Sequence, residues 1–357
     1  MTPTRQPAML PLAFRSFREA EPGPKWRSLF GQFWPAYKAW FFSEGDAARP
    51  AYLPSLRALR AAMPELAPTY ETLCELAGGS DRAARFLSLY CPPAYLSGCS
   101  QLVWHDGEPA LIRNYDYAPW LCEGVLLLTA WNGRRVMAMS DCAWGVLDGM
   151  NEDGLAVSLS FGGRRVLGLG FGVPLLLRYV LEFCTTVAEA AQALARIPVH
   201  MAYNVTMVDR QGHFLTVFLS PDHAAVVRNV PLATNHQTRV ELPHHAALTR
   251  SVEREHYLRM RLGWLGDDLE IVARDFLKPP LYATDYRHGF GTLYTAVYRP
   301  RQGALELRWP GFSWHQSFHE FREEQCLVRF PSNRSGVSTL RSTDLSGIVA
   351  HPHHAHG

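Results

Sequence analysis

The chain has 357 residues, of which 47% are hydrophobic and 19% charged, as is typical of a globular protein. Its 35 basic and 33 acidic residues give a net charge of +2, so the composition carries no electrostatic footprint for nucleic acid or an anionic membrane surface. The start of the chain lacks the apolar stretch of a secretory signal, and the longest clean apolar run, 166–177, is too short to span a bilayer. These features predict a cytoplasmic protein without a membrane span or a nucleic-acid partner.

The seven cysteines are an odd number and show no CxxC spacing. This pattern predicts free thiols in a reducing compartment, because neither a disulfide framework nor a zinc knuckle fits it. Most of these cysteines are expected to pack as small hydrophobic residues. The sequence therefore implies no metal or other cofactor.

Residues 1–98 are predicted to be helical with polar outer faces. Apolar residues recur at three- and four-residue steps along 17–42, 53–79 and 80–91, and proline and glycine mark the ends of these stretches. We therefore expect a helical N-terminal segment that ends at Gly98.

After this segment the pattern becomes that of strands. Residues 99–117 hold two short apolar runs joined by HDGEP, which predicts a hairpin. A helical pattern returns at 175–197, where Thr185 and Thr186 could cap a second helix, and again at 251–265. Further strand patterns occupy 124–131, 134–140, 155–161, 203–209, 213–220, 292–300 and 304–311. Helices beside hairpin-connected strands favour layers of helix on antiparallel sheet over a βαβ repeat.

The Gly98–Cys99 pair lies where the helical pattern gives way to strands. If the bond between these residues were cut, Cys99 would begin a strand and its α-amine would be free. That amine has an unperturbed pKa of about 7.7–8.0, against about 8.5 for a free thiol, so it is suited to take the thiol proton near neutral pH. Taken alone, the pair is also compatible with an ordinary buried strand cysteine.

Four further polar residues could accompany this cysteine. Arg113 and Asp116 lie in RNYDY on the second strand of the predicted hairpin, which can return them to Cys99; they could also form a simple cross-strand salt bridge. Asn151 lies in a turn-to-strand segment, DGMNEDGL, and Asn235 lies at a strand end in PLATNHQ. Both asparagines could instead be turn residues that tolerate unusual backbone angles.

A further pair, Ser251 and Arg254, opens the helix predicted at 251–265. Taken in order, all these fragments closely resemble the isopenicillin-N acyltransferase-like family, a branch of the N-terminal-nucleophile hydrolases related to the choloylglycine hydrolases. The resemblance covers about residues 68–300 and includes the Gly-Cys junction, RNYDY, GMNEDGL, NVTMVDRQG, TNHQ and GTLYTAVY.

The resemblance implies an α+β fold, a four-layer αββα sandwich with two antiparallel sheets between helical layers. Residues 99–345 would form the catalytic domain, and residues 1–98 would remain bound as a small subunit after cleavage. The last residues, 346–357, end in HPHHAHG and are expected to be a disordered His-rich tail, with metal binding as the alternative.

The resemblance also implies roles for the site residues. Cys99 would be the nucleophile, released by self-cleavage after Gly98, and Arg113 and Asp116 would orient it and hold its amine. The thiolate would attack the carbonyl of a small-molecule amide or acyl donor and form a thioester. Water would then complete a hydrolase reaction, and an amine acceptor an acyltransferase reaction.

Three residues would complete the site implied by the resemblance. Asn235 would donate its side-chain amide to the oxyanion, Asn151 would be a second contributor, and Arg254 would be a supporting charge. Thr292, in GFGTLY, lies where relatives have a hydroxyl residue near the site.

Two alternatives remain open at this point. His236, next to Asn235, could serve Cys99 as the base of an internal cysteine–histidine hydrolase that needs no cleavage. The chain could also be an unprocessed, non-catalytic binding protein on the same scaffold.

Overall fold

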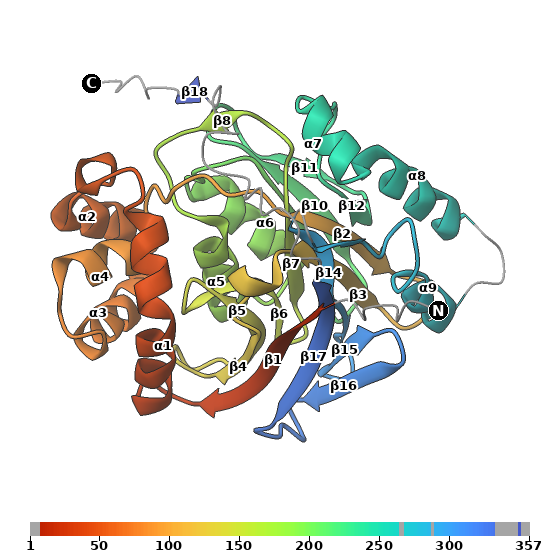
Figure 1. The fold of residues 1–357 in the computed structure, drawn as a ribbon, viewed down its shortest axis with the longest axis horizontal. Helices are drawn as coiled ribbons and strands as arrows, with labels where there is room; N and C mark the ends of the chain where they lie inside the picture. The colour runs from red at the N-terminus through yellow and green to blue at the C-terminus, as the bar shows by residue number, and fades with distance from the viewer. Residues whose placement is uncertain (1–7, 264–267, 287–288, 333–348, 351–357) are drawn as a thin grey trace, which may run out of the picture.

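The computed structural model describes residues 8–263, 268–286, 289–332 and 349–350 (Figure 1). Within these residues the chain forms a nine-stranded and a seven-stranded sheet. The larger sheet has the order β11-β10-β9-β7-β6-β5-β4-β1-β17, and its pairs are antiparallel except β1 with β4. Its strands are β1 (Ala8–Glu19), β4 (Val125–Thr129), β5 (Val136–Asp141), β6 (Gly145–Asn151), β7 (Ala156–Phe161), β9 (Tyr203–Val208), β10 (Phe214–Leu219), β11 (Val226–Arg228) and β17 (Gln325–Ser332).

The smaller sheet is antiparallel throughout and has the order β12-β2-β3-β14-β15-β16, with β13 beside β14. Its strands are β2 (Gly98–Trp104), β3 (Ala110–Tyr117), β12 (Leu232–Ala233), β13 (Thr284–Asp285), β14 (Phe290–Arg299), β15 (Ala304–Trp309) and β16 (Phe312–Ser317). Strands β2 and β3 contact β7 and β9, so the two sheets are stacked face to face. The core between them holds apolar side chains from both sheets.

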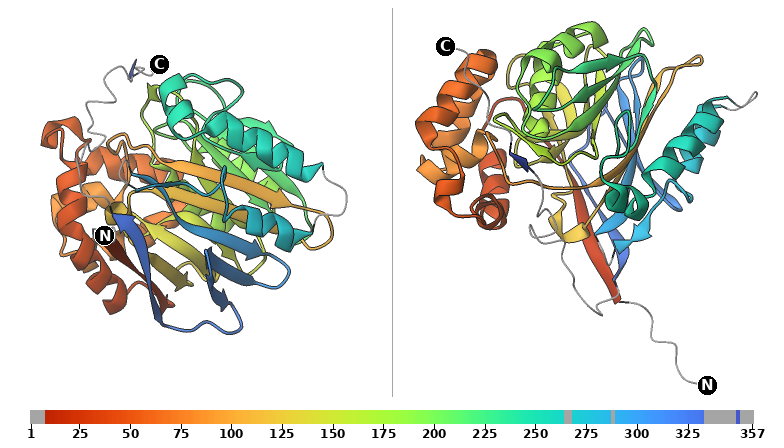
Figure 2. Two further views of the ribbon diagram at one scale, coloured as in Figure 1. Left: turned by 45° about the vertical axis from the view of Figure 1, so that its right-hand side comes forward. Right: turned by 90° about the horizontal axis from the view of Figure 1, so that it is seen from above.

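Helices cover the outer face of each sheet. Helices α5 (Val173–Phe183) and α6 (Val187–Arg196) pack on the nine-stranded sheet. On the seven-stranded sheet, α8 (Ser251–Leu262) and α9 (Leu269–Asp275) bury apolar side chains against β2, β3 and β14, with α7 (Pro243–Leu248) beside α8. Figure 2 shows the two groups of helices on opposite sides of the strands. The expected α+β fold with αββα layers is confirmed.

The helical pattern at 175–197 is divided as expected. Helix α5 ends at Phe183, and the Thr186 side chain caps α6 in a capping box with Glu189.

Within the described residues, no helix is long and apolar enough to cross a membrane.

The described part of the N-terminal segment, residues 8–98, contains four α-helices, which pack together beside the sandwich (Figure 1). They are α1 (Pro24–Phe41), α2 (Tyr52–Ala62), α3 (Ala67–Leu76) and α4 (Asp81–Leu87). Short 3₁₀ turns lie at Asp46–Ala48, Pro64–Leu66 and Pro119–Leu121.

The prediction of a wholly helical segment 1–98 is wrong for its first part. Residues 8–19 form β1, which lies inside the nine-stranded sheet between β4 and β17. Phe14 is fully buried and its ring contacts those of Tyr294 and Trp309. The antiparallel partner of β1 is β17, which lies near the other end of the chain, so local periodicity could not reveal this pairing.

The C-terminal tail is described over two residues. Val349–Ala350 form β18, which pairs in parallel with β8 (Val166–Leu167). The rest of the predicted tail, 346–348 and 351–357, lies outside the described residues.

The N-terminal helices are held to the sandwich at the β5–β6 turn, where Cys142 and Ala143 have positive φ angles. The Trp26 indole donates a hydrogen bond to the Ala143 carbonyl at 3.0 Å, and the Tyr37 hydroxyl contacts Glu123 and accepts the Cys142 N–H at 2.9 Å. Burial raises the pKa of Glu123. For Asp141, at the end of β5, burial and the nearby Glu123 raise the pKa to about 7.

The raised pKa of Asp141 predicts a pH-dependent stability. In the unfolded chain an aspartate ionises near pH 3.9, so between about pH 4 and pH 7 the folded protein retains a proton that the unfolded chain releases. The free energy of unfolding from this group is therefore greatest below pH 4 and falls as pH rises to about 7. Asp141→Asn should gain stability relative to the wild type over this interval. Denaturant unfolding at pH 4.5 and pH 8 checks this, and a difference that does not change with pH would contradict it.

Candidate active site

The predicted hairpin is confirmed as β2 and β3, and its register places the candidate residues. Gly98 lies opposite Asp116, and Cys99 lies opposite Tyr115. Side chains alternate between the two faces of a strand, so Cys99 and Arg113 share the face directed between the sheets. Asp116 projects from the opposite face, toward α8.

On the face between the sheets, Arg113 holds the thiol. Its Nη2 lies 3.4 Å from the Cys99 sulfur, while its Nη1 forms a fully buried ion pair with Asp148 of β6. Tyr294 and Tyr298 of β14 donate their hydroxyls to the same carboxylate at 2.7 and 2.6 Å. The ion pair therefore links the two sheets, and both oxygens of the Asp148 carboxylate accept a hydrogen bond from a tyrosine.

On the opposite face, the Asp116 carboxylate lies at the Gly98–Cys99 junction. It accepts the Thr292 hydroxyl at 2.7 Å, and Arg254 Nη1 lies 3.8 Å from its other oxygen. A Cβ on Gly98 would lie 2.9 Å from the Asp116 Cβ, closer than real Cβ contacts. Glycine at position 98 is thus what allows the carboxylate to approach the junction.

A β-bulge in β14 lets one strand serve both faces. Thr292 lies opposite Asp116, whereas Tyr294 lies opposite Tyr115, and the register shifts between them. In a regular strand these two residues would point to the same face; the extra residue turns Thr292 toward the carboxylate and Tyr294 toward Arg113.

The backbone of Cys99 is held by Asn235 and Arg254. The Cys99 N–H donates to Asn235 Oδ1 at 2.9 Å, and Arg254 donates to the Cys99 carbonyl and, at 2.7 Å, to Asn235 Oδ1. The Asn235 amide donates to the carbonyls of Ser97 and Phe161 at 3.2 and 3.3 Å. The side-chain amide thus lies directly beside the predicted scissile bond.

Cys99, Asp116 and Arg254 are almost completely buried. Burial raises the pKa of the Cys99 thiol, and the neighbouring Arg113 offsets part of that rise. Burial also raises the pKa of the Asp116 carboxyl, and Arg254 and Thr292 counteract it. The surroundings of the Cys99 thiol therefore favour its protonated form.

The structure does not bring Asn151 to this cluster, although the sequence placed it at the oxyanion. Its side-chain amide donates to the carbonyls of Leu181 and Cys184 at the end of α5, and its Oδ1 accepts the Leu155 N–H. With both amide hydrogens and its oxygen engaged, Asn151 closes the β6–β7 turn and holds α5. The physical reason is its place at the end of β6, against the helix layer.

The alternative base, His236, is also engaged elsewhere. Its Nδ1 lies 2.8 Å from Ser251 Oγ and its Nε2 lies 2.7 Å from a Glu255 oxygen. This arrangement gives no support to a cysteine–histidine dyad with Cys99.

Sequence reasoning missed Asp148, Tyr294 and Tyr298. One signal was present: Asp148 is a lone acid within the apolar strand sequence GVLDGM, and a buried carboxylate needs a partner. Nothing local to Asp148 names that partner, because Arg113 belongs to the other sheet.

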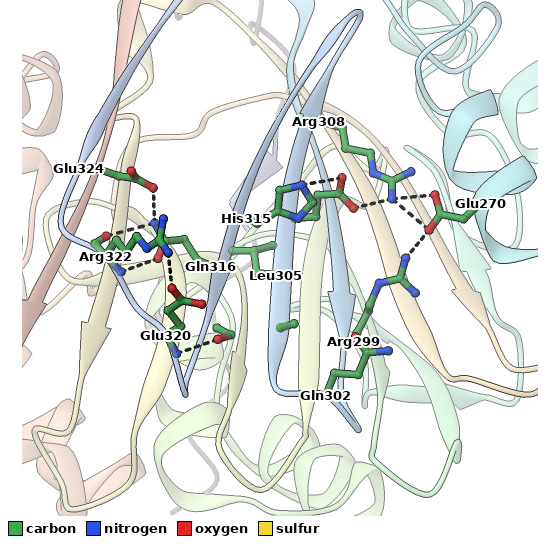
Figure 3. Close-up of a pocket in the computed structure, with 13 residues that line it drawn as sticks. Glu270, Arg299, Gln302, Leu305, Arg308, His315, Gln316, Glu320, Arg322 and Glu324 are labelled. Carbon is green, nitrogen blue, oxygen red and sulfur yellow. Dashed lines mark hydrogen bonds and ion pairs between the residues drawn. The ribbon is translucent and has the colours of Figure 1, made fainter.

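A cavity of about 580 Å³ lies away from these residues, against the β15–β16 hairpin (Figure 3). Its charged side chains pair with one another: Arg308 with Glu270 and Glu306, and Arg322 with Glu320. None of the residues around Cys99 lines it. This cavity is therefore separate from the buried cluster at Cys99.

Comparison with known families identifies the class of protein. The model of the family "Acyl-coenzyme A:6-aminopenicillanic acid acyl-transferase" matches residues 104–314. The match covers more than half of the chain, so the chain belongs to this family, as its motifs predicted. The protein is thus an enzyme of the amide hydrolase or acyltransferase class. The match begins after Cys99 and therefore does not include that residue.

Several solved structures are similar over about two thirds of the chain. A mutant of conjugated bile acid hydrolase from Clostridium perfringens has 13% identity and a TM-score of 0.39, and covers 68% of this chain and 100% of its own. Penicillin V acylase from Agrobacterium tumefaciens has 15% identity and a TM-score of 0.42, and the match covers 65% of this chain and 91% of the acylase. The Caenorhabditis elegans ortholog of N-acylethanolamine-hydrolyzing acid amidase has 17% identity and a TM-score of 0.46, and the match covers 64% of this chain and 99% of the amidase. No curated protein matches the chain in sequence.

The buried ion pair predicts a large effect of Asp148→Asn. The substitution leaves the Arg113 charge without a counterion inside the protein, which costs about 3–5 kcal/mol of unfolding free energy. Denaturant unfolding measures the loss. Asp153→Asn is the matched control, since it breaks a partly exposed ion pair with Arg134 and should cost less than about 1 kcal/mol. Equal effects of the two variants would contradict a structural role for the Arg113–Asp148 pair.

Proposed function

We propose that this chain is a self-processing N-terminal-nucleophile enzyme that cleaves or transfers the acyl group of linear amides through a thioester on Cys99. The observation that carries the proposal is the hydrogen bond from the Cys99 backbone nitrogen to Asn235 Oδ1. The sulfur of the same cysteine contacts Arg113. Arg254 donates to the same Oδ1, so the acceptor beside the Cys99 nitrogen is itself fixed in place.

In the processing step, the Cys99 sulfur attacks the Gly98 carbonyl carbon. The Gly98–Cys99 C–N bond breaks, a thioester joins Gly98 to the sulfur, and the proton lost by the thiol passes to the Cys99 nitrogen. Water then hydrolyses the thioester to a Gly98 carboxylate and a free thiol. Support comes from the Asp116 carboxylate at the junction and from the Asn235 amide one carbonyl upstream.

After processing, the Cys99 amine becomes the base that the buried thiol requires. Asn235 Oδ1 would accept a hydrogen bond from this amine, as it does from the peptide N–H. Departure of Ser97 would free the Asn235 amide to donate to the oxyanion of the substrate. The thiolate displaces the amine of the substrate, which leaves with the proton that the Cys99 amine had taken.

The thioester is then released by an acceptor. Water gives a carboxylic acid and makes the enzyme a hydrolase; a second amine gives a new amide and makes it an acyltransferase. The ratio of these products in the presence of added amine decides between the two.

Cys99→Ala should remain a single chain and lose all amidase activity, because one sulfur performs both the cleavage and the substrate reaction. Cys99→Ser should show a slower version of both steps. Intact-mass measurement detects the fragment that begins at residue 99. Cys91→Ala, which removes another buried cysteine from the same linker region, is the control and should be processed normally. Cleavage of the alanine variant at the same bond would overturn the self-processing proposal.

Asn235→Ala should lower the rate of acyl-enzyme formation by about 10²–10³-fold, the usual cost of losing an oxyanion donor. Single-turnover kinetics with an activated amide or ester measure this step. Gln237→Ala removes a neighbouring amide that donates to the carbonyls of Leu219 and Tyr203, and should change the rate little. An unchanged rate in Asn235→Ala would remove this residue from the site.

A further inference from the structure

A chain of hydrogen bonds runs from the start of α8 to the site residue Asn235. The Asn235 N–H donates to Ser251 Oγ at 2.8 Å, Ser251 Oγ contacts His236 Nδ1 at 2.8 Å, and His236 Nε2 contacts Glu255 at 2.7 Å. The proposed mechanism assigns no role to Ser251, His236 or Glu255.

The spacing of residues along α8 explains how one helix supplies this chain of hydrogen bonds. Ser251 and Glu255 are four residues apart, and Arg254 is three residues from Ser251, so all three lie on one face of α8. Arg254 reaches the Cys99 carbonyl from this face, while Ser251 and Glu255 bracket His236. One turn of helix therefore contacts both the side chain and the backbone of Asn235.

The donors along the chain can point in one direction. Asn235 donates its N–H to Ser251, the Ser251 hydroxyl can donate to His236 Nδ1, and the ring can donate from Nε2 to Glu255. Glu255 suits the end of the chain, because the contact with His236 lowers its pKa to about 2 and so keeps the acceptor ionised. Hydrogen bonds aligned in this way strengthen one another in a buried setting.

A serine, a histidine and a glutamate in this order also resemble the parts of a serine hydrolase. We assign no nucleophilic role to Ser251, because its oxygen already accepts the Asn235 backbone N–H and lies 3.1 Å from the Thr234 hydroxyl. The arrangement is therefore suited to holding a neighbour in place.

We infer that Ser251, His236 and Glu255 are positioning residues, which fix the Asn235 backbone so that Oδ1 meets the Cys99 nitrogen and the side-chain amide meets the substrate carbonyl. The inference rests on the proposed function, since it assigns a purpose to these three residues through Asn235. The second anchor of Asn235 is Arg254, which binds its Oδ1 directly. Asn235 is therefore held at its backbone nitrogen by Ser251 and at its side-chain oxygen by Arg254.

The test compares variants of Glu255 in the full-length protein. Glu255→Ala removes the acceptor of His236 and should lower kcat by about 10-fold with little change in KM, the size of effect seen when the support of a site residue is lost. It should slow the appearance of the fragment beginning at Cys99 to a similar degree. Glu255→Gln keeps an acceptor oxygen and should restore most of both rates, which a loss of general stability would not produce.

Two controls lie on the same helix. Arg259 binds the other oxygen of Glu255, so Arg259→Gln tests this carboxylate's surface contact and leaves the His236 contact in place. Glu253→Gln removes an exposed acid that pairs with Arg250. Both should keep wild-type kcat and processing. Wild-type kcat in Glu255→Ala, or equal losses in Glu255→Ala and Arg259→Gln, would overturn the inference.

A readout independent of catalysis separates this inference from the proposed function. Ser251→Ala removes the acceptor of the Asn235 N–H, so hydrogen exchange should become faster in the peptide that contains Asn235, with the β2–β3 hairpin unchanged. If the wild type is neither cut nor active, the proposed function fails while the exchange result still tests the positioning contact. Unchanged exchange in Ser251→Ala would overturn the contact itself.

Discussion

The ion pair between Arg113 and Asp148 is the interaction on which the site depends. It joins a strand of each sheet across the buried core, where an isolated charge would be very unfavourable. Two tyrosine hydroxyls complete the coordination of the carboxylate, so the guanidinium is held with one nitrogen on Asp148 and another beside the Cys99 sulfur. Since the position of the charge is set by the stacking of the sheets, the environment of the thiol follows from the fold.

The alternation of side chains along β2 divides the site into two halves. The sulfur lies between the sheets with Arg113, whereas Asp116 and Thr292 lie on the helix side at the Gly98 junction. The backbone of Cys99 is the border between these halves and is bound by Asn235 and Arg254. Cys99 is thereby contacted at its sulfur, its backbone nitrogen and its carbonyl oxygen by residues from different elements.

The N-terminal segment is part of the sandwich as well as its neighbour. Its β1 lies between two strands of the larger sheet, and Phe14 packs among aromatic rings of the other sheet. Trp26 and Tyr37 tie the following helices to the β5–β6 turn. If the chain is cut before Cys99, these contacts would keep the segment bound, because none of them depends on the peptide bond that is lost.

Local patterns in the sequence predicted the β2–β3 hairpin and the α5–α6 break, and the family resemblance implied the αββα fold and the association of Cys99 with Arg113, Asp116, Asn235 and Arg254. These features depend on periodicity, on turn residues and on an ordered set of motifs. The sequence could not place β1, since its partner strand is almost a full chain length away. It also could not show that Asn151 faces a helix, that Asp148 is the counterion of Arg113, or that His236 supports Asn235. Each of these depends on which faces of distant elements meet, and that is decided when the two sheets stack and α8 packs on the second.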